Sequence, residues 1–216
     1  GSEMCIRDRK ANKDRIYDNL NTLSTFNSCP EQEGITRALF SEAEIGARSY
    51  VKELMTQAGL LVTEDAIGNI FGTLVGGCPD LAPVWSGSHI DTVRNGGMYD
   101  GMVGVIGAIE ACRIIKENNN SHQRSITALV FTSEEPTRYK FGCIGSRALA
   151  GHLSLEETKG LVDENGISLY DELNRLGYTE MDYSKVMRRK GDVFASVELH
   201  IEQAPVLEPV SYTHLT

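Results

Sequence analysis

The sequence lacks the features of nucleic-acid-binding proteins and of membrane proteins. It has no excess of basic residues: its formal net charge is −9 at pH 7, and a charge of that sign repels nucleic-acid phosphates. It also has no apolar run near the roughly 20 residues that span a bilayer, and no basic segment followed by an apolar one near its N-terminus. We therefore expect no nucleic-acid partner, no membrane association and a cytoplasmic location.

Paired cysteines are missing as well. The five cysteines are widely scattered and form no Cys-x-x-Cys motif, which argues against a zinc ribbon or a redox couple. We expect reduced thiols, most of them filling the core. What remains is an ordinary globular composition, because 41% of the 216 residues are apolar and 24% are charged. A chain of this size and composition can bury a core of its own.

Apolar residues recur with helical and strand spacing in alternation along the chain. Helical spacing predicts amphipathic helices over 12–27 and 41–59, a buried helix over 101–116, a helical turn over 145–151, and surface helices over 169–176 and 183–189. Apolar or alternating runs predict strands over 60–63, 70–75, 84–90, 125–131 and 194–200. Interleaved helices and strands predict an α/β layered domain with a mixed, largely buried sheet flanked by helices.

Metal-type side chains occur at the ends of three predicted strands, those over 84–90, 125–131 and 194–200, which we expect to be inner strands. In open α/β sheets, ligands collect outside the carboxyl ends of the strands. A mixture of imidazole and carboxylate groups is preferred by zinc and by other divalent metals such as manganese. The residues concerned are His89, Asp91, Asp100, Glu134, Glu135, His200 and Gln203.

The backbone around these side chains favours a common site. The glycine-rich stretch NGGMYDG, residues 95–101, permits tight or left-handed turns that would return Asp100 toward His89. The adjacent carboxylates of Glu134 and Glu135 should point apart, since consecutive residues alternate in direction. One of them could then bind metal while the other faces a water molecule.

Each of these features has a simpler explanation when it is taken singly. A His-x-Asp pair is more often a polar strand end, paired glutamates are usually solvated, and His200 could be a satisfied core histidine. Their conjunction at several strand ends favours metal binding. The glycines at 96–97 fit no phosphate-binding pattern. A nucleophilic mechanism through Ser133 or Cys143 is weaker, because no G-x-S-x-G motif accompanies them.

Three blocks carry a resemblance to a known family: GSHIDTVRNGGMYDG, FTSEEPTRYKFGCIGSRALAG and VELHIEQAPVLE. In the same order they resemble the signature blocks of the amidohydrolases acting on allantoate, ureidoglycolate and N-carbamoyl amino acids, within the aminoacylase-like dinuclear metallopeptidase superfamily. The resemblance implies that residues 10–208 are the N-terminal part of a catalytic domain, truncated before the lid and dimerisation domain of longer, homodimeric relatives that also supply a late histidine ligand. Residues 1–9 and 209–216 are interpreted as non-native tails.

The resemblance also implies a centre of two divalent metal ions, zinc or manganese. On the matching positions, Asp100 would bridge the two ions. His89 and His200 would bind one ion, and Glu135 would bind the other. The substrate would be a small molecule with a ureido or carbamoyl C–N bond, attacked by a metal-activated water.

Further roles follow from the same resemblance. Glu134 would be the general base, Asp91 would hold His89 in its orientation, and Gln203 would contact the substrate. The Asp100–Gly101 peptide bond would be cis. Two alternatives stay open: an aminopeptidase or aminoacylase of the same superfamily, and a non-catalytic, truncated metal-binding module.

Overall fold

A five-stranded mixed sheet forms the centre of the computed structural model, which describes residues 10–206. Its strands are β1 (Leu61–Glu64), β2 (Ile70–Leu74), β3 (Val84–His89), β4 (Ile126–Phe131) and β5 (Ala195–Val197). They lie in the order β1-β2-β4-β3-β5. The pairs β1–β2 and β2–β4 are antiparallel, whereas β3 is parallel to both β4 and β5. The expected α/β fold with a mixed sheet is confirmed.

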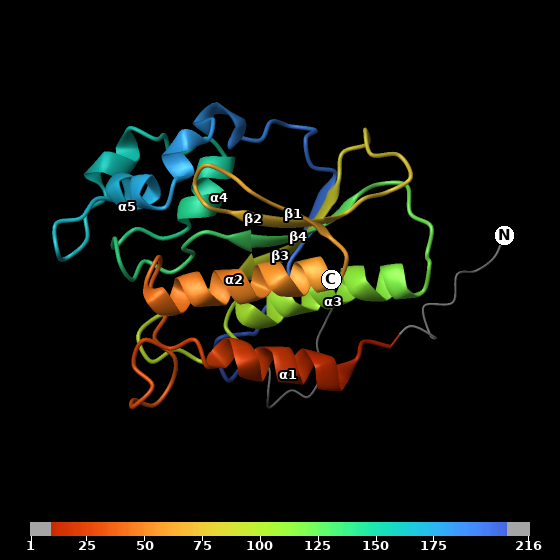
Figure 1. Ribbon diagram of the computed structural model, residues 1–216, viewed down its shortest axis with the longest axis horizontal. Coiled ribbons are helices and arrows are strands. Elements are labelled where there is room, and N and C mark those ends of the chain that lie inside the picture. Colours follow the sequence, from red (N-terminus) through yellow and green to blue (C-terminus); the bar gives the residue numbers. More distant parts are fainter. Residues whose placement is uncertain (1–9, 207–216) are drawn as a thin grey trace.

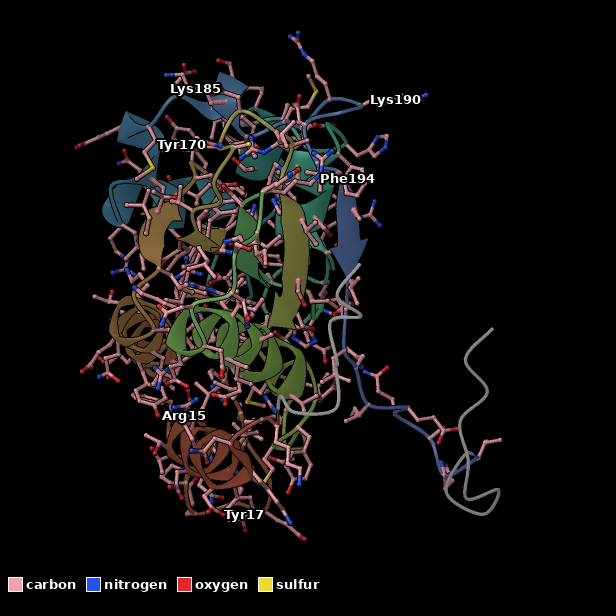
Figure 2. All side chains as sticks on the ribbon, turned by 90° about the vertical axis from the view of Figure 1, so that its right-hand side faces the viewer. Arg15, Tyr17, Tyr170, Lys185, Lys190 and Phe194 are labelled. Atoms are coloured by element: carbon pink, nitrogen blue, oxygen red, sulfur yellow. The ribbon has the colours of Figure 1, made fainter. Side chains whose placement is uncertain are left out.

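Helices cover both faces of this sheet (Figure 1). On one side lie α2 (Glu42–Gln57) and α3 (Met102–Glu117), with α1 (Lys13–Ser24) outside them. On the other side lie α4 (Ile144–Leu149), α5 (Leu169–Arg175) and three short 3₁₀ turns: η2 (Glu157–Gly160), η3 (Tyr178–Glu180) and η4 (Tyr183–Lys185). Figure 2 shows the helices on the two faces of the sheet from the side, with the labelled Arg15 and Tyr17 on α1 at one end of the view and Tyr170 and Lys185 at the other.

Individual side chains explain where α2 begins and why α3 lies close to the sheet. The side chain of Ser41 accepts a hydrogen bond from the backbone N–H of Glu44 and caps α2. Within α3, a Cβ on Gly104 would lie 2.7 Å from the Cβ of Ser88 on β3. Glycine at this position therefore lets α3 approach the strand that ends in His89. No helix within residues 10–206 is long and apolar enough to cross a membrane.

The last predicted helix and the last predicted strand are both shorter in the structure than expected. The helix expected over 183–189 is only the three-residue turn η4, because the backbone N–H of Arg188 bonds to the carbonyl of Leu149 instead of continuing the helix. The strand expected over 194–200 is the short β5, which is exposed and lies at the sheet edge rather than inside it. After Val197 the chain turns toward α3, and the carbonyl of Leu199 lies against Gly104.

Burial of the sheet is accordingly uneven. Buried positions predominate in β2 and β4 and fill the second half of β3, whereas β1 is partly exposed and β5 wholly so. The four cysteines within residues 10–206 are unpaired, as expected, but only Cys112 is buried. The expectation that most cysteines fill the core is therefore wrong for the other three.

Candidate metal centre

Two parallel strands bring the predicted site residues to one edge of the sheet. In the β3–β4 ladder His89 lies opposite Phe131, so both strands end side by side. A cavity of about 520 Å³ lies at this edge. Its lining includes His89, Glu134, Cys143, His200 and Gln203. Larger cavities of about 940 and 810 Å³ elsewhere in the described part of the chain contain none of the predicted site residues.

His89 is the buried centre of the cluster, with 2% of its surface exposed. Its Nδ1 lies 3.0 Å from the backbone carbonyl oxygen of Asp91. Because a carbonyl only accepts, Nδ1 carries the hydrogen, and the lone pair of the neutral ring is on Nε2. That Nε2 is buried without a hydrogen-bond partner, and it lies 3.9 Å from a carboxylate oxygen of Asp100 and 3.9 Å from one of Glu134.

The charge around His89 favours a cation. Burial acts to lower the pKa of His89, but its contacts with Asp91 and the negative charge of Glu134 outweigh burial and raise this pKa to about 9. The orphaned nitrogen and the acidic surroundings are what a divalent ion requires. The residues present therefore fit a metal.

Asp100 and His200 complete the first group of candidate ligands. The Nε2 of His200 lies 3.3 Å from Oδ1 of Asp100. The rings of His89 and His200 are stacked, with centroids 6.0 Å apart. One ligand atom from each of His89, Asp100 and His200 lies within 4.8 Å of the others. The side-chain amide of Gln203 donates to both carboxylate oxygens of Asp100, at 2.9 and 3.0 Å.

Glu134 and Glu135 form a second group of candidate ligands with His89, again within 4.8 Å. They follow Ser133, whose left-handed backbone (φ +47°) turns the chain after β4. The carboxylate of Asp91 accepts hydrogen bonds from the backbone N–H groups of both glutamates, at 3.1 and 3.0 Å. Burial, together with the charge of Glu134, raises the pKa of Glu135. Of the two carboxylates, only that of Glu134 lines the cavity, and the division of roles between them stays a prediction.

The turn between Asp100 and α3 depends on glycine. Gly101 has a φ of +71°, and a Cβ there would lie 2.6 Å from three atoms of the His89 ring. Only a residue without a side chain leaves the imidazole in place. The peptide bonds in the described part of the chain include no cis bond. The expected cis Asp100–Gly101 bond is therefore wrong, since the left-handed glycine makes the turn.

Some residues that organise the site were not predicted from the sequence. Asn69 is fully buried, and its side-chain oxygen accepts the N–H of Thr132 at 2.9 Å, which fixes the end of β4. Glu198 accepts a hydrogen bond from the hydroxyl of Ser88 at 2.6 Å. The only sequence signal for Asn69 is its place in the turn between two predicted strands, and Glu198 has no signal beyond its position beside His200.

A buried imidazole and several carboxylates lie together at the carboxyl edge of a mixed α/β sheet, an arrangement typical of metal-dependent hydrolases. The chain belongs to peptidase family M28, whose family model matches residues 69–204. This family and the related amidohydrolases are metal-dependent, and the chain carries candidate ligand groups.

Individual relatives agree with the amidohydrolase resemblance, which is confirmed. The chain is 45% identical over 198 residues to a ureidoglycolate hydrolase of Arabidopsis thaliana, covering 89% of this chain and 41% of the relative. It is 38% identical over 200 residues to an N-carbamoyl-L-amino-acid amidohydrolase of Paenarthrobacter aurescens, covering 93% and 48%. A crystal structure of AtUAH in complex with glyoxylate superposes with a TM-score of 0.87 at 42% identity, covering 94% and 49%. The chain thus spans less than half the length of these proteins.

Proposed function

We propose that the protein hydrolyses a linear ureido or carbamoyl C–N bond, in ureidoglycolate, allantoate or an N-carbamoyl amino acid. The observation that carries the proposal is the buried, unpartnered Nε2 of His89, which faces carboxylate oxygens of Asp100 and Glu134. The names of the relatives, a ureidoglycolate hydrolase and N-carbamoyl-amino-acid and allantoate amidohydrolases, support the substrate class.

The ligands would be divided between two divalent ions, zinc or manganese. We assign Asp100 to the bridge between the ions and Glu135 to one ion. We assign His89 and His200 to the other ion, with Asp91 holding His89 in the tautomer that frees Nε2. When bound, the ions would lower the pKa of an attacking water and polarise the scissile carbonyl.

Glu134 is the carboxylate best suited to carry a proton. Its side chain is 44% exposed, and it faces the site cavity. We assign it to accept a proton from the attacking water and to deliver that proton to the leaving nitrogen. Gln203, whose amide already reaches the Asp100 carboxylate, would donate to the substrate.

A peptidase or aminoacylase activity is the second candidate, and the description of the matching family as a peptidase family favours it. The cytoplasmic location and a homodimeric full-length form stay predictions. A small-molecule ureido or carbamoyl compound is the partner that we propose.

The experiment compares substrates and one variant. The chain, and the longest product of the gene that encodes it, are loaded with zinc or manganese and assayed on the three ureido and carbamoyl substrates and on dipeptides. Turnover of a ureido or carbamoyl substrate supports the proposal, and turnover of dipeptides alone overturns it. Glu134→Gln should keep the metal but lose at least about 100-fold in rate. Metal binding without turnover of any substrate would instead support a non-catalytic module.

A further inference from the structure

Arg37 is a buried arginine whose charge has no direct partner within residues 10–206. Its side chain is fully enclosed, at 0% exposure. The Nε and Nη1 atoms have no hydrogen-bond partner, and Nη2 contacts only the sulfur of Met102, at 3.2 Å. Burial of an unpaired cation is costly. This arginine is therefore poorly explained as a source of stability.

The position of Arg37 links the two segments that carry site residues. Its backbone N–H donates to Oγ1 of Thr92 at 2.9 Å, and its carbonyl accepts the N–H of Thr92 at 3.0 Å. Thr92 directly follows Asp91, which orients His89. Met102, the contact of the guanidinium, opens α3 directly after the turn that presents Asp100.

Burial lowers the pKa of Arg37 to about 10, and the negative charges of Glu44 and Asp91 act against this shift. Glu44 is already bound by Arg48 at 3.4 Å and by the backbone N–H of Phe40 at 3.1 Å. Asp91 is 1% exposed, and its carboxylate accepts backbone N–H groups but no side-chain cation other than a protonated His89. The enclosed Arg37 lies between two site segments: its backbone bonds to Thr92, the residue after Asp91, and its guanidinium contacts Met102, the first residue of α3.

We propose that Arg37 is a positioning residue of the metal centre: its buried charge holds Asp91 and the start of α3 so that His89 and Asp100 present their ligand atoms to the same ion. The inference rests on the proposed metal centre. It predicts that Arg37 contributes to metal affinity rather than to the stability of the fold.

The test measures binding of Co²⁺ alone, from its visible absorption in competition with a chelator, beside thermal unfolding of the metal-free chain. Arg37→Met should unfold at the wild-type temperature or above, because an unpaired buried charge is replaced by an apolar side chain of similar length. Its Co²⁺ affinity should fall about 10- to 100-fold, the range for residues that orient metal ligands. Arg37→Lys, which keeps the charge, should recover at least half of that loss on a logarithmic scale.

Arg138→Met is the matched control. Arg138 is largely buried and ion-paired with Asp163 at 3.0 Å and Glu172 at 3.4 Å, so it shares no acid with Arg37. This variant should unfold at a lower temperature but bind Co²⁺ like the wild type, the opposite pattern from Arg37→Met.

Each failure has its own signature. Absence of Co²⁺ binding by the wild type would contradict the proposed metal centre and, with it, the proposed function. If the wild type binds Co²⁺ and Arg37→Met binds it equally well, the proposed role of Arg37 is overturned but the metal centre is not. An unfolded Arg37→Met would also overturn the inference, as would an Arg37→Lys variant that binds as weakly as Arg37→Met.

Discussion

Alanine in place of Gly101 gives the sharpest view of how the backbone holds the site. The substitution has two separable effects. The residue has a φ of +71°, which L-residues rarely adopt, and the new Cβ would lie 2.6 Å from the Cδ2, Cε1 and Nε2 atoms of His89. The first effect is a local backbone cost. The second displaces the imidazole that both groups of candidate ligands share.

The magnitudes of these effects differ. A backbone with positive φ costs an L-residue about 1–3 kcal/mol, and each kcal/mol lowers the unfolding temperature of a chain of this size by about 2–4 °C. Gly177→Ala supplies the control, because Gly177 has a φ of +82° and no atom within 4 Å of the new Cβ. Both variants should therefore unfold a few degrees below the wild type. The collision with His89 should lower the unfolding temperature of Gly101→Ala further.

Titration of the metal-free variants with Zn²⁺ separates the two effects. Gly177→Ala should bind like the wild type, whereas Gly101→Ala should bind about 10- to 100-fold more weakly, as expected when a metal ligand loses its orientation. Equal Zn²⁺ affinity of Gly101→Ala and the wild type would show that the displaced His89 ring is not a ligand.

Three further predictions concern stability. Asp91→Asn should lower the free energy of unfolding of the metal-free chain by about 1.5–3 kcal/mol, since its side chain can accept only one of the two backbone N–H groups and loses the charge; a urea midpoint equal to the wild type would contradict this. Burial raises the pKa of Cys112 from 9.0 to about 11, so the thiol stabilises the fold fully below pH 9 and loses that contribution as the pH rises toward 11. From pH 8 to pH 10 the wild type should lose about 1.4 kcal/mol more than Cys112→Ala, and parallel losses in urea unfolding would refute the shift. Ser41→Ala should cost about 1 kcal/mol through the lost cap of α2, and Ser49→Ala, on the exposed face of the same helix, is the comparison.

Sequence periodicity predicted the elements whose burial is set locally. The strands over 84–90 and 125–131 were recognisable because their apolar residues are contiguous, and both occur in the sheet. The elements predicted over 183–189 and 194–200 are too long, because long-range contacts end the observed helical turn and strand earlier. The carbonyl of Leu149 captures the N–H of Arg188, and the chain after Val197 turns toward α3.

The candidate site was predictable to the extent that its residues sit at strand ends. Metal-type residues at a strand end, such as His89, carry their own chemical signal, and the parallel pairing of β3 with β4 brings two of the three groups together. Arg37 and Asn69 carry no such signal. Each is an ordinary polar residue in a connecting segment, and its role arises only from contacts with residues more than 50 positions away.

Zinc-edge anomalous diffraction from crystals of the chain soaked in Zn²⁺ would show whether these side chains bind a metal ion together. We expect a strong anomalous peak enclosed by Nε2 of His89, Nε2 of His200 and the carboxylate of Asp100, and the loss of that peak in His89→Ala crystals. Anomalous peaks confined to other parts of the surface, or a peak at this position that survives in His89→Ala, would contradict this expectation.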